Sequence, residues 1–299
     1  MTTTVCLFNP RAAGGRSAAL REPLGMVLAQ RQIGLVVPET VAAAQAQLAA
    51  LPPGSRVIVA GGDGTVQQVL PALLAHGHRL ALLPTGTGND LARALGLRGL
   101  DWRDALTRAL TAPTRPLDVG LVDAGHGPQP FLSSLTVGFD AAVGARAHEA
   151  PRWLRGMPRY TLAALRELVS LPSHRVRWQA DDGPVHETQA LLASTLNTPT
   201  YASGMRAAPA ARPDDGWLDL VIAGRFGRLG ALAMMPLLMA GWHGLHPRVT
   251  LARYRELLLE ADTALPLALD GEPIAASRRL QVRVQPAALA VVAAAHPTE

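Results

Sequence analysis

Short apolar runs alternate with amphipathic stretches over the first third of the chain. Unbroken apolar runs predict four buried strands, at residues 4–8, 34–37, 56–60 and 79–83. Helical spacing of the apolar residues predicts helices at 17–31 and 41–51, and a glycine-rich turn followed by a helix comes after each of the last two strands. Strands that alternate with helices are typical of a parallel sheet covered by helices.

From about Pro116 the pattern changes to a succession of strand candidates. We predict strands at residues 117–122, 131–137, 176–180, 190–196, 218–223, 256–260 and 265–269. Helical stretches interrupt this region at 159–171 and 229–242. The second stretch is apolar on nearly every face, contains Pro236 and is too short to span a bilayer. It either packs in the interior, which the pattern favours, or contacts lipid.

The composition is that of a globular cytoplasmic protein. Hydrophobic residues make up 48% and charged residues 17% of the 299 residues, a balance that excludes a disordered chain and suits two domains. The single cysteine, Cys6, lies in an apolar run, where we expect it to be a core residue. The first residues do not resemble a secretory signal, and no run approaches the roughly 20 apolar residues of a transmembrane helix.

The net charge of +5 comes mainly from arginine and suits anionic partners such as nucleotide phosphates or an anionic membrane face. No dense basic run with interleaved aromatics is present, so we expect no nucleic-acid partner. The sequence also lacks the motifs of P-loop enzymes, serine hydrolases and zinc peptidases. His76 and His78 have no cysteine or histidine partner at ligand spacing, and we interpret them as surface residues.

The strongest local motif is Gly61-Gly62-Asp63-Gly64-Thr65, which joins a predicted buried strand to a helix. Glycines let backbone N–H groups close on phosphate oxygens, and the helix N-terminus adds partial positive charge. Asp63 would repel a phosphate directly. Its carboxylate makes sense beside phosphates if it works through a magnesium ion or the water around it.

A second turn of this kind runs from Pro84 to Arg93, again between a strand and a helix. Asn89 or Asp90 could simply cap that helix. However, adjacent parallel strands place both turns at the same carboxyl edge of the sheet, where ligands bind in open α/β folds. A third loop, residues 9–16, follows the first strand and would reach the same edge.

An ordered set of motifs resembles the diacylglycerol kinase catalytic family, which includes soluble bacterial lipid kinases and, more distantly, sphingosine and ceramide kinases. The matching segments are Asn9-Pro10, 61–65, 83–93, 117–120, 137–141, 215–220 and 269–273. NAD kinases share the Gly-Gly-Asp-Gly-Thr turn, so the ordered set carries the resemblance. The set covers nearly the whole chain.

The resemblance implies a fold and a division into domains. It implies an NAD kinase- or phosphofructokinase-like α/β domain over residues 1–117, to which about 281–299 return. It also implies a mainly antiparallel β domain over residues 118–280, with the active cleft between the two. A homodimer is compatible with this arrangement.

The resemblance also implies roles for residues at matched positions. The nucleotide would be bound by Asn9, Pro10, Arg16, Thr40, Gly61, Gly62, Asp63, Gly64, Thr65, Val66, Gln67, Gly86 and Thr87. Glu272, helped by Asp270, would accept the proton of the attacking hydroxyl. Asp118 would be tied to the metal and its water. A second metal loop would use the Asp215 carboxylate and the carbonyls of Arg212 and Trp217. Ordinary Asp-Gly turns are the alternative at both Asp-Gly sites.

The implied activity is transfer of a phosphoryl group from ATP, with Mg²⁺, to the hydroxyl of diacylglycerol or a related lipid. The protein would then lie at the inner membrane face without a spanning helix, with contacts through Arg152, Trp153, Arg155 and the 229–242 helix. Two departures from the family pattern are Gln67-Gln68, where Asn-Glu is usual, and Ala12-Ala13-Gly14 in the first loop. An NAD kinase-like enzyme and a catalytically silent lipid- or nucleotide-binding module are the alternatives.

Overall fold

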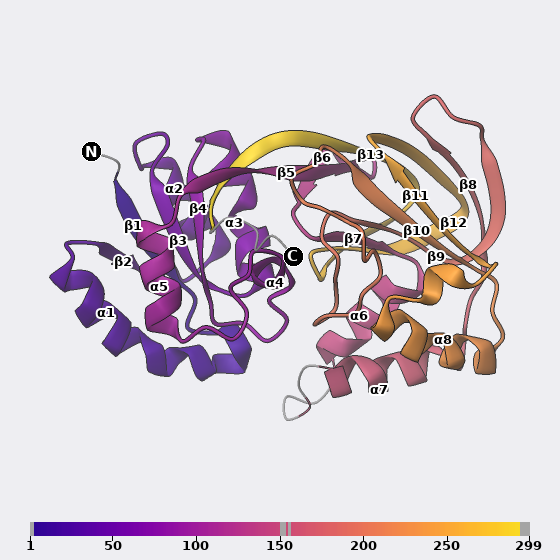
Figure 1. Cartoon of the computed structure of the whole chain (residues 1–299), viewed down its shortest axis with the longest axis horizontal. Coiled ribbons are helices and arrows are strands. Elements are labelled where there is room, and N and C mark those ends of the chain that lie inside the picture. Colours follow the sequence, from indigo (N-terminus) through magenta and orange to yellow (C-terminus); the bar gives the residue numbers. More distant parts are fainter. Residues whose placement is uncertain (1–2, 150–153, 155–156, 294–299) are drawn as a thin grey trace. The chain divides into compact units, whose positions relative to one another are not determined.

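The computed structural model describes residues 3–149, 154 and 157–293. The chain forms two compact units (Figure 1): unit 1 is Met1–Leu117 with Ala287–Glu299, and unit 2 is Asp118–Pro286. Strand β13 (Glu272–Val292) therefore begins in unit 2 and ends in unit 1.

Unit 1 contains a parallel sheet in the order β13-β4-β3-β1-β2. Its other strands are β1 (Thr4–Phe8), β2 (Gly34–Val36), β3 (Arg56–Gly61) and β4 (Arg79–Pro84). The end of β13 joins through Val291 and Val292, which lie opposite Leu80 and Ala81. Figure 1 shows this yellow end of β13 beside β4.

Helices of unit 1 fill the connections between the parallel strands. They are η1 (Ala12–Leu20), α1 (Arg21–Gln30), α2 (Val41–Ala49), α3 (Asp63–Ala75), α4 (Asp90–Ala94) and α5 (Trp102–Thr111). Apolar residues of α1 and α5 pack with alternate strand residues, among them Cys6 and Ile58. Cys6 is a core residue as expected, and burial raises the pKa of its thiol to about 12.

Unit 2 is mainly antiparallel sheet, with strands in the order β11-β10-β9-β7-β12-β13. Its strands include β5 (Thr114–Asp123), which begins in unit 1, β6 (Pro128–Phe131), β7 (Ser134–Val137), β8 (His174–Ala180), β9 (His186–Leu196), β10 (Leu218–Gly224), β11 (Val249–Tyr254) and β12 (Glu256–Leu269). Strand β8 pairs with both β9 and β12. Phe131, Trp178 and Tyr254 anchor the core of the unit.

In the described part of unit 2, four helices accompany this sheet: α6 (Phe139–Glu149), α7 (Met157–Glu167), α8 (Arg228–Ala240) and the short η2 (His243–Leu245). Among the described residues, no helix is long and apolar enough to cross a membrane. The expected membrane contacts Arg152, Trp153 and Arg155 lie outside the described residues.

Several element boundaries differ from the sequence expectation. The single strand expected at 131–137 is two strands, β6 and β7. Conversely, the two strands expected at 256–260 and 265–269 form one strand, β12, whose register shifts between them. The sequence pattern also missed α6 and β11, because neither shows a clean periodicity in its short run of residues.

Two expectations about exposure were wrong. The preferred interior packing of the 229–242 helix fails, because Ala231 is the only buried residue of α8 and Leu229 is 83% exposed. His78 is not a surface residue but is 1% exposed, and its Nε2 lies 2.9 Å from the Leu48 carbonyl oxygen. A backbone partner within the fold therefore explains that histidine.

Candidate functional site

The two glycine-rich turns meet at the carboxyl ends of β3 and β4. A Cβ atom added to Gly86 would lie 2.5 Å from the Gly62 Cα, and one added to Gly61 would lie 2.5 Å from the Thr65 Oγ1. No side chain fits at these contacts, so glycine is required for the close approach of the backbones. The structure thus brings the two turns together at one edge of the sheet.

The first loop joins the same edge through Asn9. Its Nδ2 donates to the Thr65 Oγ1 at 2.9 Å, and its Oδ1 accepts from the Arg11 N–H at 2.9 Å. Buried Ser17 adds a second link, since its Oγ lies 3.1 Å from the Ala12 carbonyl oxygen and 3.3 Å from that of Thr85. Sequence analysis missed Ser17, whose neighbours in the chain give it no distinguishing signal.

Asp63 has a structural partner that the sequence could not indicate. Its carboxylate accepts hydrogen bonds from the N–H groups of Asp90 at 3.0 Å and Leu91 at 3.2 Å, and so caps α4 from another loop. Asn89 occupies the N-cap position with a φ of 51°, but makes no side-chain capping bond. Its Nδ2 donates to the Gly86 carbonyl oxygen at 2.9 Å instead. The negative charge of Asp63 suits the helix N-terminus that it caps.

The other residues expected to bind nucleotide differ in how far they are buried. Arg16 and Thr87 are exposed, whereas Val66 is buried in the first turn of α3. The Thr40 Oγ1 accepts from the Ala43 N–H at 3.1 Å and caps α2. The remaining members, Pro10, Gly64 and Gln67, are partly buried.

In unit 2, the Asp270 carboxylate holds a neighbouring turn. It accepts the backbone N–H groups of residues 132–134 at 2.9, 2.7 and 2.9 Å. This turn is what separates β6 from β7. Asp270 itself has a φ of 49°, and Gly271 follows with a φ of 89°. Three charge-assisted bonds stabilise the Asp270 carboxylate as an acceptor.

Glu272 differs from Asp270 although only one residue separates them. It is partly exposed at the start of β13. Within the described part of the chain, no group donates a hydrogen bond to its carboxylate. Of the two expected catalytic acids, Glu272 is therefore the one whose carboxylate is open to an external proton.

The expected second metal loop is braced by Asp118. This buried carboxylate accepts from the Gly216 N–H at 2.6 Å, and the Asp118 N–H donates to the Pro213 carbonyl oxygen at 2.7 Å. The Asp215 carboxylate forms an ion pair with Arg253 and also accepts from the Trp217 N–H at 3.1 Å. These bonds explain why the loop keeps its shape.

The environment of that loop does not fit a divalent cation well. The guanidinium groups of Arg253 and Arg255 lie 5.4 and 4.5 Å from the centre of the Trp217 ring, and Arg212 is exposed. The described residues contain no cluster of three or more His, Cys, Asp or Glu side chains able to hold a metal ion. A cation at Asp215 would have to displace Arg253, and the metal role stays a prediction.

Two further acids of unit 2 are shaped by burial. Burial raises the pKa of Asp140 to about 6, against hydrogen bonds that lower it, including one from the Ser194 Oγ at 2.7 Å. Burial also raises the pKa of Asp219 to about 6, although Arg253 opposes the shift. Both carboxyl groups therefore lose their protons at a higher pH than an ordinary aspartate does.

Comparison with known proteins covers both units. Residues 3–122 match the model of the diacylglycerol kinase catalytic domain, and residues 133–293 match that of the YegS C-terminal NAD kinase beta sandwich-like domain. The chain is 30% identical over 297 residues to a protein from Mycobacterium tuberculosis described as "Diacylglycerol kinase", covering 97% of this chain and 94% of the relative. It is 34% identical over 290 residues to a Pseudomonas aeruginosa protein described as "Probable lipid kinase YegS-like", covering 93% and 91%.

Solved structures show the same fold. A diacylglycerol kinase from Bacillus anthracis aligns with a TM-score of 0.67 at 18% identity, covering 97% of this chain and 96% of that one. An NAD kinase from Archaeoglobus fulgidus in complex with ATP aligns with a TM-score of 0.56 at 11% identity, covering 97% and 93%. Both likenesses confirm the expected fold class, an α/β domain followed by a mainly antiparallel β domain.

Proposed function

This chain belongs to the diacylglycerol kinase family, and from that premise we propose that it transfers the terminal phosphoryl group of ATP to the free hydroxyl of diacylglycerol or a related lipid. The observation that carries the proposal is the backbone contact between Gly62 and Gly86. It supports a phosphate cradle lined by N–H groups at the sheet edge, next to the N-terminus of α3.

Mg²⁺ fits the donors at this edge. Magnesium is usually held by one or two carboxylates together with substrate phosphates and waters. Asp63 provides one carboxylate among the glycine turns, and the enclosed Thr85 Oγ1 has no hydrogen-bond partner among the described residues. Asp63 would hold the ion, which would supply neutralisation of the charge on the transferred phosphoryl group.

Glu272 accepts the proton of the attacking lipid hydroxyl, and Asp270 is a positioning residue. A positioned carboxylate can take that proton as the oxygen attacks phosphorus. Asp270 fixes the turn that leads into Glu272 by holding residues 132–134. In this proposal Glu272 accepts the proton, and Asp270 holds the loop in place.

The experiment is a transfer assay with purified protein, labelled ATP, Mg²⁺ and a panel of dispersed lipids that carry free hydroxyls, with NAD and nucleosides as soluble acceptors. We expect lipid to be phosphorylated. Glu272→Gln should bind ATP normally but lose about 10²-fold or more in turnover. Glu256→Gln, an exposed acid at the start of β12, is the matched control and should leave turnover unchanged.

Two outcomes would contradict the proposal. Turnover of Glu272→Gln at the wild-type rate would remove the base assignment. Phosphorylation of NAD alone would favour the NAD kinase-like alternative, and ATP binding without transfer to any acceptor would favour the silent module. The lipid acceptor also leads us to propose peripheral attachment to the inner membrane face.

A further inference from the structure

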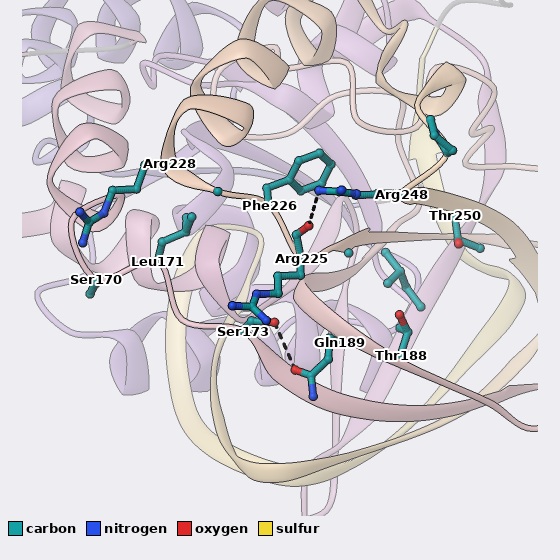
Figure 2. Close-up of a pocket in the computed structure, with 14 residues that line it drawn as sticks. Ser170, Leu171, Ser173, Thr188, Gln189, Arg225, Phe226, Arg228, Arg248 and Thr250 are labelled. Atoms are coloured by element: carbon teal, nitrogen blue, oxygen red, sulfur yellow. Dashed lines mark hydrogen bonds between the residues drawn. The ribbon is translucent and has the colours of Figure 1, made fainter.

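A pocket lies in unit 2, and none of the residues that line it is assigned above to nucleotide, metal or proton transfer. It has a volume of about 870 Å³, within the range of ordinary ligand pockets. Its walls come from β9, β10, β11, the segment after α7 and the start of α8 (Figure 2).

Positive charge dominates this pocket. Arg225, Arg228 and Arg248 line it, and among the described residues no Asp or Glu does. None of the three forms an ion pair with a carboxylate in the described part of the chain. Arg248 donates to the Arg225 carbonyl oxygen at 3.1 Å, and Arg228 donates to the Val169 carbonyl oxygen at 2.7 Å. Three guanidinium groups without a carboxylate favour an anion, because guanidinium forks match phosphate oxygens.

Neutral donors complement the arginines. Figure 2 shows the Arg225 side chain extending toward Ser173 and Gln189, which are themselves joined by a 3.3 Å hydrogen bond. Helix α8 begins at the pocket with Gly227 as its N-cap and no side-chain capping bond. The N–H groups of its first turn therefore add to the donors available for an anion.

Three exposed apolar residues are close in sequence to residues that line the pocket. Val169, Leu229 and Leu245 are 68%, 83% and 86% exposed. Val169 precedes Ser170 in the sequence, Leu229 follows Arg228, and Leu245 lies two residues before Pro247. Apolar side chains beside arginines are typical of a surface that enters the headgroup region of a bilayer.

We propose that this arginine pocket binds the phosphate group of an anionic phospholipid and so attaches unit 2 to the membrane. The arginines and the start of α8 contact the phosphate, while the neighbouring apolar side chains enter the acyl boundary. The inference deepens the proposed membrane attachment. Because vesicle binding needs no nucleotide, its failure is distinguishable from a failure of phosphotransfer.

The test is flotation of the full chain, without nucleotide, on vesicles of phosphatidylcholine with or without phosphatidylglycerol. We expect binding only to the anionic vesicles. Arg225→Gln should weaken it about fivefold, and Arg225→Gln with Arg248→Gln by at least about tenfold. The matched control combines Arg31→Gln with Arg278→Gln, which removes the same charge from exposed positions outside the pocket and should bind like wild type.

Calorimetry with inorganic phosphate separates the two sources of the ligand. Phosphate that binds the pocket while anionic vesicles do not would overturn the lipid assignment. An equal loss of vesicle binding in the control variant would show that total charge, not the pocket, attracts the membrane. Thermal unfolding measures whether the variants remain folded. If the double variant is unstable, the vesicle binding of Arg225→Gln alone tests the proposal. This variant should stay folded, because the Arg225 side chain makes no hydrogen bond in the described chain.

Discussion

The glycine turns of unit 1 and the acidic loops of unit 2 are built by opposite means. In unit 1, Gly62 and Gly86 touch because neither carries a side chain. In unit 2, Asp118 and Asp270 shape their loops by accepting backbone N–H groups. The close approach of two backbones can therefore be predicted from a glycine motif alone. A carboxylate in a motif, by contrast, has either a catalytic role or the structural role of holding the loop, and the motif does not distinguish the two.

The largest effect should follow from closing the glycine contact in unit 1. A valine at Gly86 would place its Cβ 2.5 Å from the Gly62 backbone, which has to move. We expect Gly86→Val to lower the free energy of unfolding by about 3 kcal/mol and to abolish ATP binding. Urea denaturation and calorimetry measure the two effects.

Gly25→Ala is the control for that variant. Its added Cβ would meet only Leu35 Cδ2, at an ordinary 3.5 Å, and should stabilise the helix by about 0.5–1 kcal/mol. Normal ATP affinity in Gly86→Val would show that the backbone contact is not the cradle.

The next effect compares the two neighbouring acids of unit 2. Asp270→Ala leaves the N–H groups of residues 132–134 without their acceptor, so we expect a loss of about 2–3 kcal/mol in the free energy of unfolding. Glu272→Ala should change it by no more than about 0.5 kcal/mol. Denaturation of both variants measures the difference, and equal losses would contradict the division of roles.

A pH series on Asp140 tests an acid for which the effect of burial on the pKa outweighs that of its hydrogen bonds. Its pKa rises on folding from 3.8 to about 6, so its contribution to stability is complete below 3.8 and is lost as pH rises through about 6. Asp140→Asn should therefore gain stability relative to wild type over that interval, by on the order of 2 kcal/mol. Denaturant unfolding across the interval checks the sign, which would reverse if the carboxylate were stabilised in the fold.

The smallest effect concerns a side chain at the edge of unit 1. Thr40→Ala removes the cap of α2 and should cost about 1 kcal/mol. Asp101→Ala, which removes the cap of α5, is the matched control because Asp101 is not among the expected nucleotide contacts. If Thr40 also binds nucleotide, only its variant weakens ATP affinity; equal affinities would leave it a helix cap alone.

The parts of the fold that the sequence predicted depend on local signals. Apolar strand runs, helical spacing and glycine turns are patterns of neighbouring residues. The sequence therefore predicted the parallel sheet and the meeting of its turns at one edge. The parts that it missed depend on distant partners. The strand expected at 131–137 is broken because Asp270, far along the chain, holds its middle, and Asp63 caps a helix that begins at Asp90. No local pattern records such pairings.

The sequence also failed to predict which side chains are exposed to solvent. Apolar composition favoured an interior position for α8, yet its side chains lie mostly at the surface. The arginine pocket was equally hidden, because its residues come from separate segments of the chain, each unremarkable by itself.

The discontinuity of unit 1 has a consequence for the order of events during synthesis. Residues 1–117 leave the ribosome first, but the strand that pairs with Leu80 and Ala81 is supplied by residues translated after all of unit 2. Until then the outer edge of β4 is open to wrong partners. Unit 1 therefore completes its sheet only after unit 2 has been made, and a nascent chain cannot finish the two units in the order in which it begins them.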